Sequence, residues 1–242
     1  MWTLLRTRRW LSFTALVVVA IVAFGFLSHW QWSRAEERRA QRLAVASESS
    51  APPVSVAQAL ENPADWESVT ATGTYADDRT VLVRQRPLNG SNGFWVATPL
   101  RTPDGLEVWV NRGWVAATGA ATQSQAAPAA PAGLVTIIGR LREAEVTPQP
   151  APSDLPVGQV PALDPAALSA SAIGYYVESV SSDPADPGLT PIPLPEIDEG
   201  RNISYAVQWI LFAMVAVAGW LFFLRREARE DAHDREPTWT SG

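Results

Sequence analysis

Two long runs of apolar residues stand near the two ends of the chain. In the first run, from Leu11 to Trp30, the only polar side chains are Ser12, Thr14, Ser28 and His29. In the second run, from Ile203 to Leu224, hydrogen-bonding side chains interrupt the pattern only at Ser204, Tyr205 and Gln208. About twenty helical residues rise roughly 30 Å, which is the hydrocarbon thickness of a bilayer. The pattern therefore predicts transmembrane helices at 11–30 and 203–224.

Each run has an alternative interpretation. Arg6, Arg8 and Arg9 form a basic leader like that of a cleaved secretory signal. The first run is longer than a typical signal core, however, and no small-x-small cleavage site follows it, so we interpret it as an uncleaved anchor. The second run would otherwise be a buried helix of a soluble protein, but its length and all-round apolarity favour a membrane span.

The arginines that flank the two runs predict the orientation, because basic flanks tend to stay in the cytoplasm. Those before the first run and after the second are Arg6, Arg8, Arg9, Arg225, Arg226 and Arg229. A competing group follows the first run and is partly offset by Glu36 and Glu37; it comprises Arg34, Arg38, Arg39 and Arg42. We predict a multi-pass cell-membrane protein whose N-terminus (1–10) and tail (225–242) are cytoplasmic.

The polar pattern between the two runs predicts one extracytoplasmic domain. Residues 31–53 are charged and helix-compatible before they turn to Ser, Ala and Pro, which predicts a juxtamembrane helix and linker. From Trp66 the apolar period changes to two, and turn residues recur at short intervals. The predicted strands, expected to form a meander, are SVTATGTY, TVLVRQR, GFWVATPL, LEVWVNRGWV, LVTIIGRLRE and YYVESV. Residues 54–200 thus predict a β-rich domain.

Shorter signals refine this domain. Ser55-x-x-Gln58 resembles a capping box, and Asp164 before Pro165 is typical of a helix start, so two short helices are predicted. Gly139 indicates a bulge, and residues 117–132 have the low complexity of a mobile loop. A proline-rich stretch, 184–195, predicts an extended connector. The predicted fold class is membrane α+β, with a small antiparallel β-barrel-like domain bracketed by two transmembrane helices.

Composition excludes several classes of function. Between Arg34 and Gly200 the chain has 11 arginines against 20 acidic residues, which disfavours binding to nucleic acid or to an anionic lipid surface through this domain. Cysteine is absent, and the only histidines are His29 and His233. Thiolate nucleophiles, nucleophile–histidine pairs and histidine-rich metal sites are therefore not expected, and neither is an enzyme. A hydrolase using carboxylates alone stays an alternative.

Polar residues cluster where the two spans are expected to leave the membrane on the domain side. His29, Gln31 and Arg34 close the first span, and the second opens with Arg201, Asn202, Ser204, Tyr205 and Gln208. Polar groups at this depth are costly without a partner, so they are candidates for function. The alternative is that Gln208 and His29 simply form hydrogen bonds between the helices.

Five motifs resemble the Surfeit locus protein 1 family, and together they span nearly the whole chain. They are Trp30-Gln31-x-x-Arg34, GFWVATPL (93–100), VWVNRGWV (108–115), Gly139-Arg140-Leu141 and SYAVQW (204–209). The resemblance implies a non-enzymatic assembly factor for haem-copper cytochrome c oxidase, acting when haem a enters the large catalytic subunit. Some bacterial members of the family are thought to bind haem a through a histidine just before the Ser-Tyr-Ala stretch. Here that position is Asn202, and an amide is a poor axial ligand.

We therefore expect any haem a contact to be transient and to involve a different imidazole. The hypothesis is that His29 supplies the ligand while Tyr205, Gln208 and Trp209 line the haem edge beside Asn202. Alternatively, the protein holds the large oxidase subunit without ligating haem. Its contact residues would then be Arg112 and Trp114, although a strand tryptophan is more often part of a core. A membrane-tethered scaffold or sensor for an unrelated partner is the competing function.

Overall fold

The computed structural model describes residues 6–119, 123–147, 154–169 and 173–233. These residues form two compact units. A helical unit contains the chain up to Leu43 and from Glu196 onward, and a β unit contains Ala44–Pro195. Each unit has its own packing, and each is described separately.

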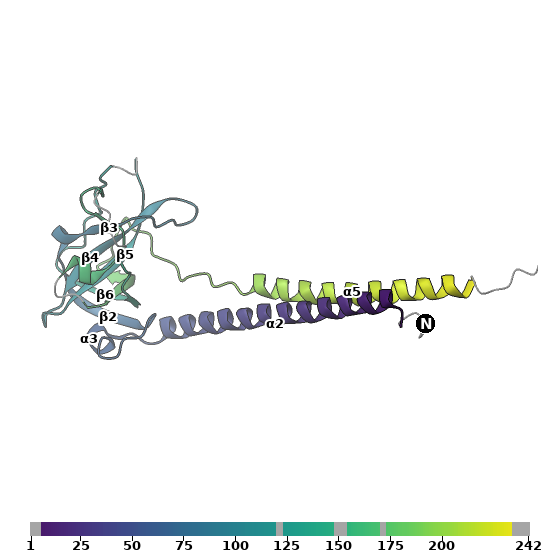
Figure 1. Ribbon diagram of the computed structural model, residues 1–242. Coiled ribbons are helices and arrows are strands. Elements are labelled where there is room, and N and C mark those ends of the chain that lie inside the picture. The colour runs from purple at the N-terminus through teal and green to yellow at the C-terminus, as the bar shows by residue number, and fades with distance from the viewer. Residues whose placement is uncertain (1–5, 120–122, 148–153, 170–172, 234–242) are drawn as a thin grey trace, which may run out of the picture. The chain divides into compact units, whose positions relative to one another are not determined.

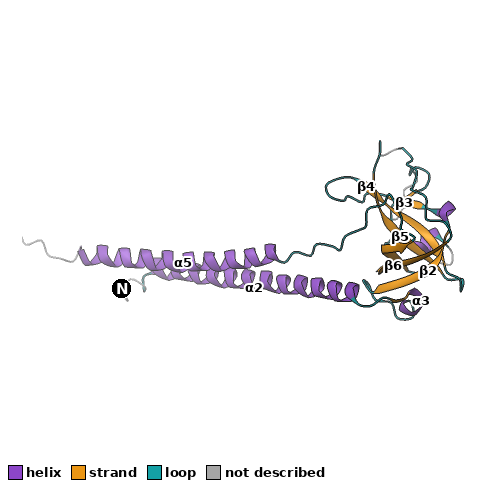
Figure 2. Cartoon of the chain, turned by 180° about the vertical axis from the view of Figure 1, so that it is seen from behind, coloured by secondary structure: helices purple, strands orange, loops and turns teal. Residues whose placement is uncertain are grey.

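The helical unit consists of α2 (Arg8–Ser50) and α5 (Gly200–His233). Both helices are long enough and apolar enough to cross a membrane, and both predicted spans lie within them. They run antiparallel and side by side (Figures 1 and 2). The predicted juxtamembrane helix is the continuation of α2, which runs without interruption to Ser50. Neither glycine nor proline occurs between Gly25 and Pro52, so nothing in this stretch breaks the helix.

The β unit is a barrel with short helices attached. Its elements are β1 (Val54–Ser55), α3 (Val56–Ala59), β2 (Ser68–Tyr75), a 3₁₀ turn (Asp77–Arg79), β3 (Val81–Val83), β4 (Gly93–Arg101), β5 (Glu107–Ala116), β6 (Leu134–Glu143), β7 (Gln159–Val160), α4 (Pro165–Leu168) and β8 (Tyr175–Asp183). The strand order is β1-β2-β6-β8-β5-β4-β3-β7, and β4 also pairs with β2. Strands β2, β6, β8, β5 and β4 therefore close into a ring, and this confirms the predicted barrel-like domain (Figure 2).

The strand partners differ from a simple meander. Strands β3, β4 and β5 pair in sequence order with antiparallel neighbours. Strand β2 instead pairs with β4 and β6, while β8 lies parallel to β5. The meander prediction is thus wrong between β2 and β3 and between β5 and β6, which are not neighbours in the sheet. An alternating pattern identifies a strand but not its neighbour.

The barrel interior is apolar. In β6 the buried positions Val135, Ile137 and Leu141 alternate with more exposed neighbours, as expected for a strand with one face on a core. Fully buried residues from other strands complete this core; they are Val69, Leu100, Val110 and Val177.

Three local predictions are confirmed by the geometry. The Ser55 hydroxyl accepts the Gln58 backbone N–H at the start of α3, and Asp164 caps α4 with Pro165 at its first turn. The β6–β8 register shifts at Gly139, where an added Cβ would lie 2.5 Å from a backbone oxygen of β8. The two helix caps and the bulge could be predicted because each depends on residues close together in the sequence.

Candidate functional site

The two helices of the helical unit meet along a seam with the spacing of a coiled coil. Buried or half-buried positions recur every three or four residues on both helices, which is the repeat that keeps one stripe facing a partner. Seam residues are Thr14, Ile21, Phe24, Ser28, Gln31 and Ala35 on α2, and Asn202, Ala206, Trp209, Ala213 and Trp220 on α5.

Polar side chains in this seam hydrogen-bond across it. The Asn202 side-chain amide donates to the Gln31 side-chain oxygen at 3.0 Å. The Ser28 hydroxyl donates to the backbone carbonyl of Ala206 at 2.9 Å. Both small residues, Ser28 and Ala206, are buried and allow the backbones to approach closely. Asn202 and Gln31 are therefore brought together, as partners of one another.

Two further contacts join the helices, one near each end of the seam. The Trp220 indole N–H donates to the Thr14 hydroxyl at 3.0 Å. Arg42 and Glu199 form an ion pair at 2.8 Å, and the hydrogen bond from Arg42 holds the pKa of the Glu199 carboxyl below its usual range. The helices are thus paired over most of the length of α5.

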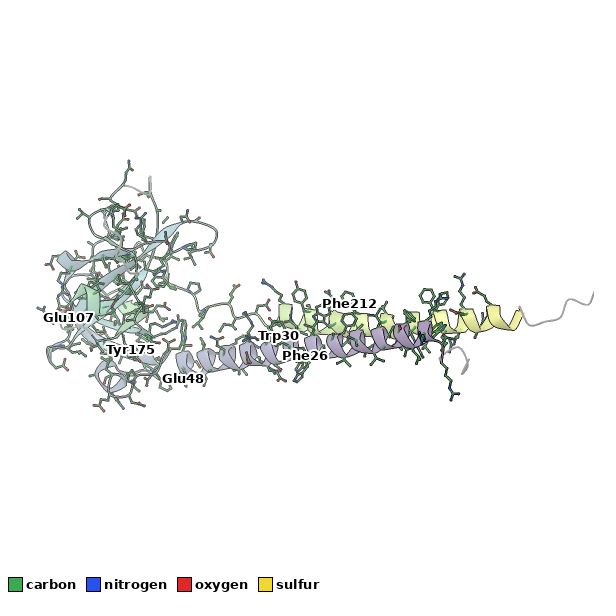
Figure 3. The ribbon with its side chains drawn as sticks, in the orientation of Figure 1. Phe26, Trp30, Glu48, Glu107, Tyr175 and Phe212 are labelled. Carbon is green, nitrogen blue, oxygen red and sulfur yellow. The ribbon has the colours of Figure 1, made fainter. Side chains whose placement is uncertain are left out.

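Trp209 is also a seam residue. Its ring stacks on Phe24 of α2 with centroids 5.7 Å apart and planes 23° apart, and Phe212 meets the Trp209 ring edge-on. The indole therefore packs between the helices. Large apolar side chains on the outside of the pair include Phe26, Trp30 and Phe212 (Figure 3).

His29, Tyr205 and Gln208 are exposed and leave the helix pair on different sides. An apolar groove between the helices, of about 420 Å³, is lined by Gly25 on α2 and Ile210 on α5, among others. His29 follows Gly25 by four residues and so continues the groove side of α2. Tyr205 and Gln208 are displaced from Ile210 by roughly 140° and 160° around α5 at 100° per residue. The predicted imidazole is therefore not beside the predicted haem edge.

In the β unit, Arg112 lies in a buried polar cluster. Its side chain is 0% exposed. Two of its nitrogens donate to the Asp186 carboxylate at 2.6 and 2.9 Å, and the two terminal nitrogens also donate to the carbonyls of Pro128 and Ala129 at 3.0 and 2.8 Å. The guanidinium lies 5.6 Å from the centre of the Tyr75 ring. Arg112 thus ties two loop segments to the barrel.

The neighbouring residues of β5 hold the proline-rich connector. The backbone N–H and C=O of Trp114 pair with those of Thr190, both at 2.8 Å. Gly113, with φ of 147°, leaves room for this approach, since an added Cβ would lie 2.9 Å from the Thr190 carbonyl oxygen. The half-buried Trp114 ring packs over Gly93, and its indole N–H donates to the Arg86 carbonyl at 2.6 Å.

A second buried ion pair joins β6 to β8, the strand that lies beside β5. Glu178 of β8 accepts a hydrogen bond from Arg140 of β6 at 3.0 Å, and both side chains are almost fully buried. Arg140 also reaches the carbonyl of Ile192 in the connector at 3.5 Å. Burial raises the pKa of Glu178, and the nearby arginines Arg142 and Arg140 oppose that rise.

Comparison with known proteins shows which family the chain belongs to. The SURF1 family matches residues 18–214, a span that includes the barrel and most of α2 with the first half of α5. The chain belongs to the SURF1 family. It is 32% identical over 240 residues to uncharacterized SURF1-like proteins of Mycobacterium bovis and Mycobacterium tuberculosis, covering 91% of this chain and 85% of each relative. It is also 35% identical over 57 residues to a SURF1-like protein of Dictyostelium discoideum, covering 24% of this chain and 21% of that one.

SURF1 membership has a general implication for function, and the structure shows what surrounds the Asn-Arg-Gly-Trp motif. It implies a role in cytochrome oxidase assembly in general, and the family is one of assembly factors. In this SURF1 protein, the residues of the Asn-Arg-Gly-Trp motif have structural neighbours: Asn111 is fully buried, Arg112 binds Asp186, and Gly113 and Trp114 receive the connector. The Arg112 guanidinium is buried against Asp186 and two loop carbonyls, and its predicted contact with the oxidase subunit stays a prediction.

The residues of the hypothesised haem site do not lie on one face of the helix pair. The Asn202 amide is engaged by Gln31, and His29 lies on the opposite side of the helix pair from Tyr205 and Gln208. Trp209 is occupied by stacking on Phe24. This arrangement separates the predicted imidazole ligand from the residues predicted to line the haem edge.

Residues outside the sequence prediction prove central to the β unit. Asp186 and Thr190 lie in a stretch read as a simple connector, and Pro128 and Ala129 lie in one read as a mobile loop. Residues 120–122 of that loop lie outside the described part of the chain. The one available signal was an arginine in an otherwise apolar strand, because a buried arginine requires acceptors from elsewhere in the chain.

Proposed function

We propose that this protein is an assembly factor that binds the large subunit of cytochrome c oxidase and assists the insertion of haem a into it. The observation that carries the proposal is the family match over residues 18–214, which covers the barrel and parts of both helices. A soluble enzyme would have no need of two spans, whereas an oxidase subunit under assembly is itself embedded in the bilayer.

The geometry supports a role in holding the subunit rather than in carrying haem. His29 and the pair Tyr205 and Gln208 are exposed on two sides of the helix pair. Exposed polar groups in a span are costly in lipid and are satisfied by polar groups of another membrane helix. The proposed contact with the oxidase subunit therefore includes the helix pair, with Trp114 as a candidate contact from the barrel.

The proposed location is the cell membrane, with both termini in the cytoplasm and the barrel on the outer side. Arginines at the free ends of α2 and α5 support this orientation, since basic flanks are retained in the cytoplasm. Reporter fusions to either end of the chain, read in the cytoplasm and outside it, test this part of the proposal. A reporter at residue 242 that is active outside would reject it.

Deletion of the gene tests the function. We expect membranes of the deletion strain to retain the large subunit but to lose the haem a absorbance band, and the full-length chain to restore that band. An affinity-tagged full-length chain should recover the large subunit from solubilised membranes. A matched control chain carries Arg101→Gln, because the Arg101 side chain is 64% exposed at the end of β4. Normal haem a content and oxidase activity in the deletion strain would instead favour a scaffold or sensor for an unrelated partner.

A further inference from the structure

The ends of the helix pair that carry the chain termini combine an apolar and a basic surface. One face of α5 lines a hollow of about 640 Å³. Its residues change from apolar to basic along the helix; they are Ala218, Leu221, Phe222, Arg225, Arg226, Arg229 and Glu230. Leu221, Arg225 and Arg229 follow one another at four-residue intervals, so they form a continuous stripe on this face.

Two of the three arginines in the hollow have no acidic partner among the described side chains. Arg226 is engaged by Glu230 at 2.9 Å, and the nearby Glu227 pairs with Arg9 of α2 at 3.6 Å. Arg225 and Arg229 are exposed, and no carboxylate among residues 6–230 with described side chains lies within ion-pairing distance of either. The hollow therefore presents net positive charge next to an apolar wall.

The depth of these groups matches the two parts of a phospholipid. Leu221 and Phe222 belong to the last turn of the apolar run, at the edge of the hydrocarbon layer. Arg225 and Arg229 lie about 6 and 12 Å further along the helix axis, in or just beyond the headgroup layer. A zwitterionic headgroup carries a positive group that the two arginines would repel. An anionic headgroup carries only negative charge, so it can pair with both arginines.

We propose that this hollow binds an anionic phospholipid, with an acyl chain against Ala218, Leu221 and Phe222 and the phosphate between Arg225 and Arg229. Such a lipid fixes the depth and rotation of α5 in the bilayer. The site is independent of the proposed role in oxidase assembly.

Lipid binding to the purified full-length chain tests the site. Native mass spectrometry in a neutral detergent gives the apparent Kd of phosphatidylglycerol and of phosphatidylcholine. Arg225→Gln and Arg229→Gln should each weaken phosphatidylglycerol binding about fivefold, and the double variant about 25-fold. The matched control is Arg8→Gln, which removes the same charge from the same end of the helix pair outside the hollow; its change should stay below twofold.

Three outcomes would overturn the proposal. Equal losses in Arg8→Gln and in Arg225→Gln would show attraction by net charge alone. Equal affinity for phosphatidylcholine would show nonspecific apolar adsorption. Displacement of the lipid by an equal concentration of soluble glycerol phosphate would show a simple anion site without a lipid-binding wall. Circular dichroism of each variant establishes that the helices are intact.

Discussion

Asp186 accepts two hydrogen bonds from the Arg112 guanidinium, at 2.6 and 2.9 Å, although the two residues are 74 positions apart. The Arg112 side chain is 0% exposed and that of Asp186 10%. A bidentate geometry of this kind is among the strongest protein hydrogen-bonding arrangements. The pair anchors the proline-rich connector, 184–195, to strand β5.

Arg112→Ala should therefore destabilise the β unit strongly. Removal of one partner leaves the other charge buried without compensation, which costs about 3–5 kcal/mol. We expect the midpoint of chemical denaturation of the solubilised full-length chain to fall, with loss of hydrogen-exchange protection in the connector, 184–195. The double variant Arg112→Met with Asp186→Leu should recover much of the stability. Arg101→Ala, on an exposed arginine, is the control and should change the free energy of unfolding by less than about 1 kcal/mol. Similar losses in Arg112→Ala and Arg101→Ala would contradict this account.

Gly113→Ala should detach the connector from β5. Its φ of 147° disfavours a side chain, and the new Cβ would lie 2.9 Å from the Thr190 carbonyl oxygen. The expected cost is more than about 1 kcal/mol in the free energy of unfolding. Gly174→Ala provides the control, because an added Cβ there meets nothing within 4 Å. Unchanged hydrogen exchange at Thr190 in Gly113→Ala would show that the connector stays on β5 without a glycine at position 113.

The Gln31–Asn202 hydrogen bond should contribute modestly to helix pairing. Double-mutant cycles with Gln31→Ala and Asn202→Ala should give a coupling energy of about 0.6 kcal/mol, and at most about 1.7, as for other hydrogen bonds between membrane helices. The measurement is unfolding of the full chain in mixed micelles. Ser204→Ala is the control, since the Ser204 hydroxyl donates to the Gly200 carbonyl of its own helix. Zero coupling would place the two amides apart in the membrane.

His29→Ala should leave the haem a content of membranes unchanged. The imidazole lies on the groove side of α2, away from Tyr205 and Gln208, so it cannot complete a site with them. Haem a is measured by its absorbance in membranes from a strain complemented with the variant. A loss of the haem a band, while the tagged variant still recovers the large subunit from solubilised membranes, would restore His29 as a ligand candidate.

Glu107 should make the β unit sensitive to acid. Arg79 donates two hydrogen bonds to its carboxylate, both at 2.8 Å, and lowers the pKa of Glu107 to about 2. Because the folded pKa lies below the unfolded one, this stabilisation is present above about pH 4.5 and is lost as the pH falls toward 2. Between pH 6 and pH 3, wild type should lose about 1–2 kcal/mol more than Glu107→Gln.

The comparison with Glu107→Gln isolates this group from other carboxyls. Burial raises the pKa of Glu178, so that residue favours the folded state more at lower pH and acts in the opposite sense. Glu178 is present in both proteins and cancels in the difference. Parallel stability curves for wild type and Glu107→Gln would show that the Arg79 pair contributes nothing in solution.

Local signals predicted much of the fold. The two helices followed from the length of the apolar runs, the caps at Ser55 and Asp164 from single side chains, and the bulge from Gly139. Each depends on residues within one turn or one strand of each other. The candidate site was predicted less well: Asn202 and Gln31 do meet, but the helix rotation that separates His29 from Tyr205 is set by packing along the seam.

The sequence by itself determined that this protein has a β-barrel domain with one apolar helix before it and one after it in the chain, because hydrophobic period and run length are local properties. Only the tertiary structure decided that β8 pairs with β5, that Asp186 meets Arg112 and that Asn202 is paired with Gln31. Those contacts join residues from 67 to 171 positions apart. They arise because buried polar groups must find partners wherever the closed barrel and the helix seam bring the chain together.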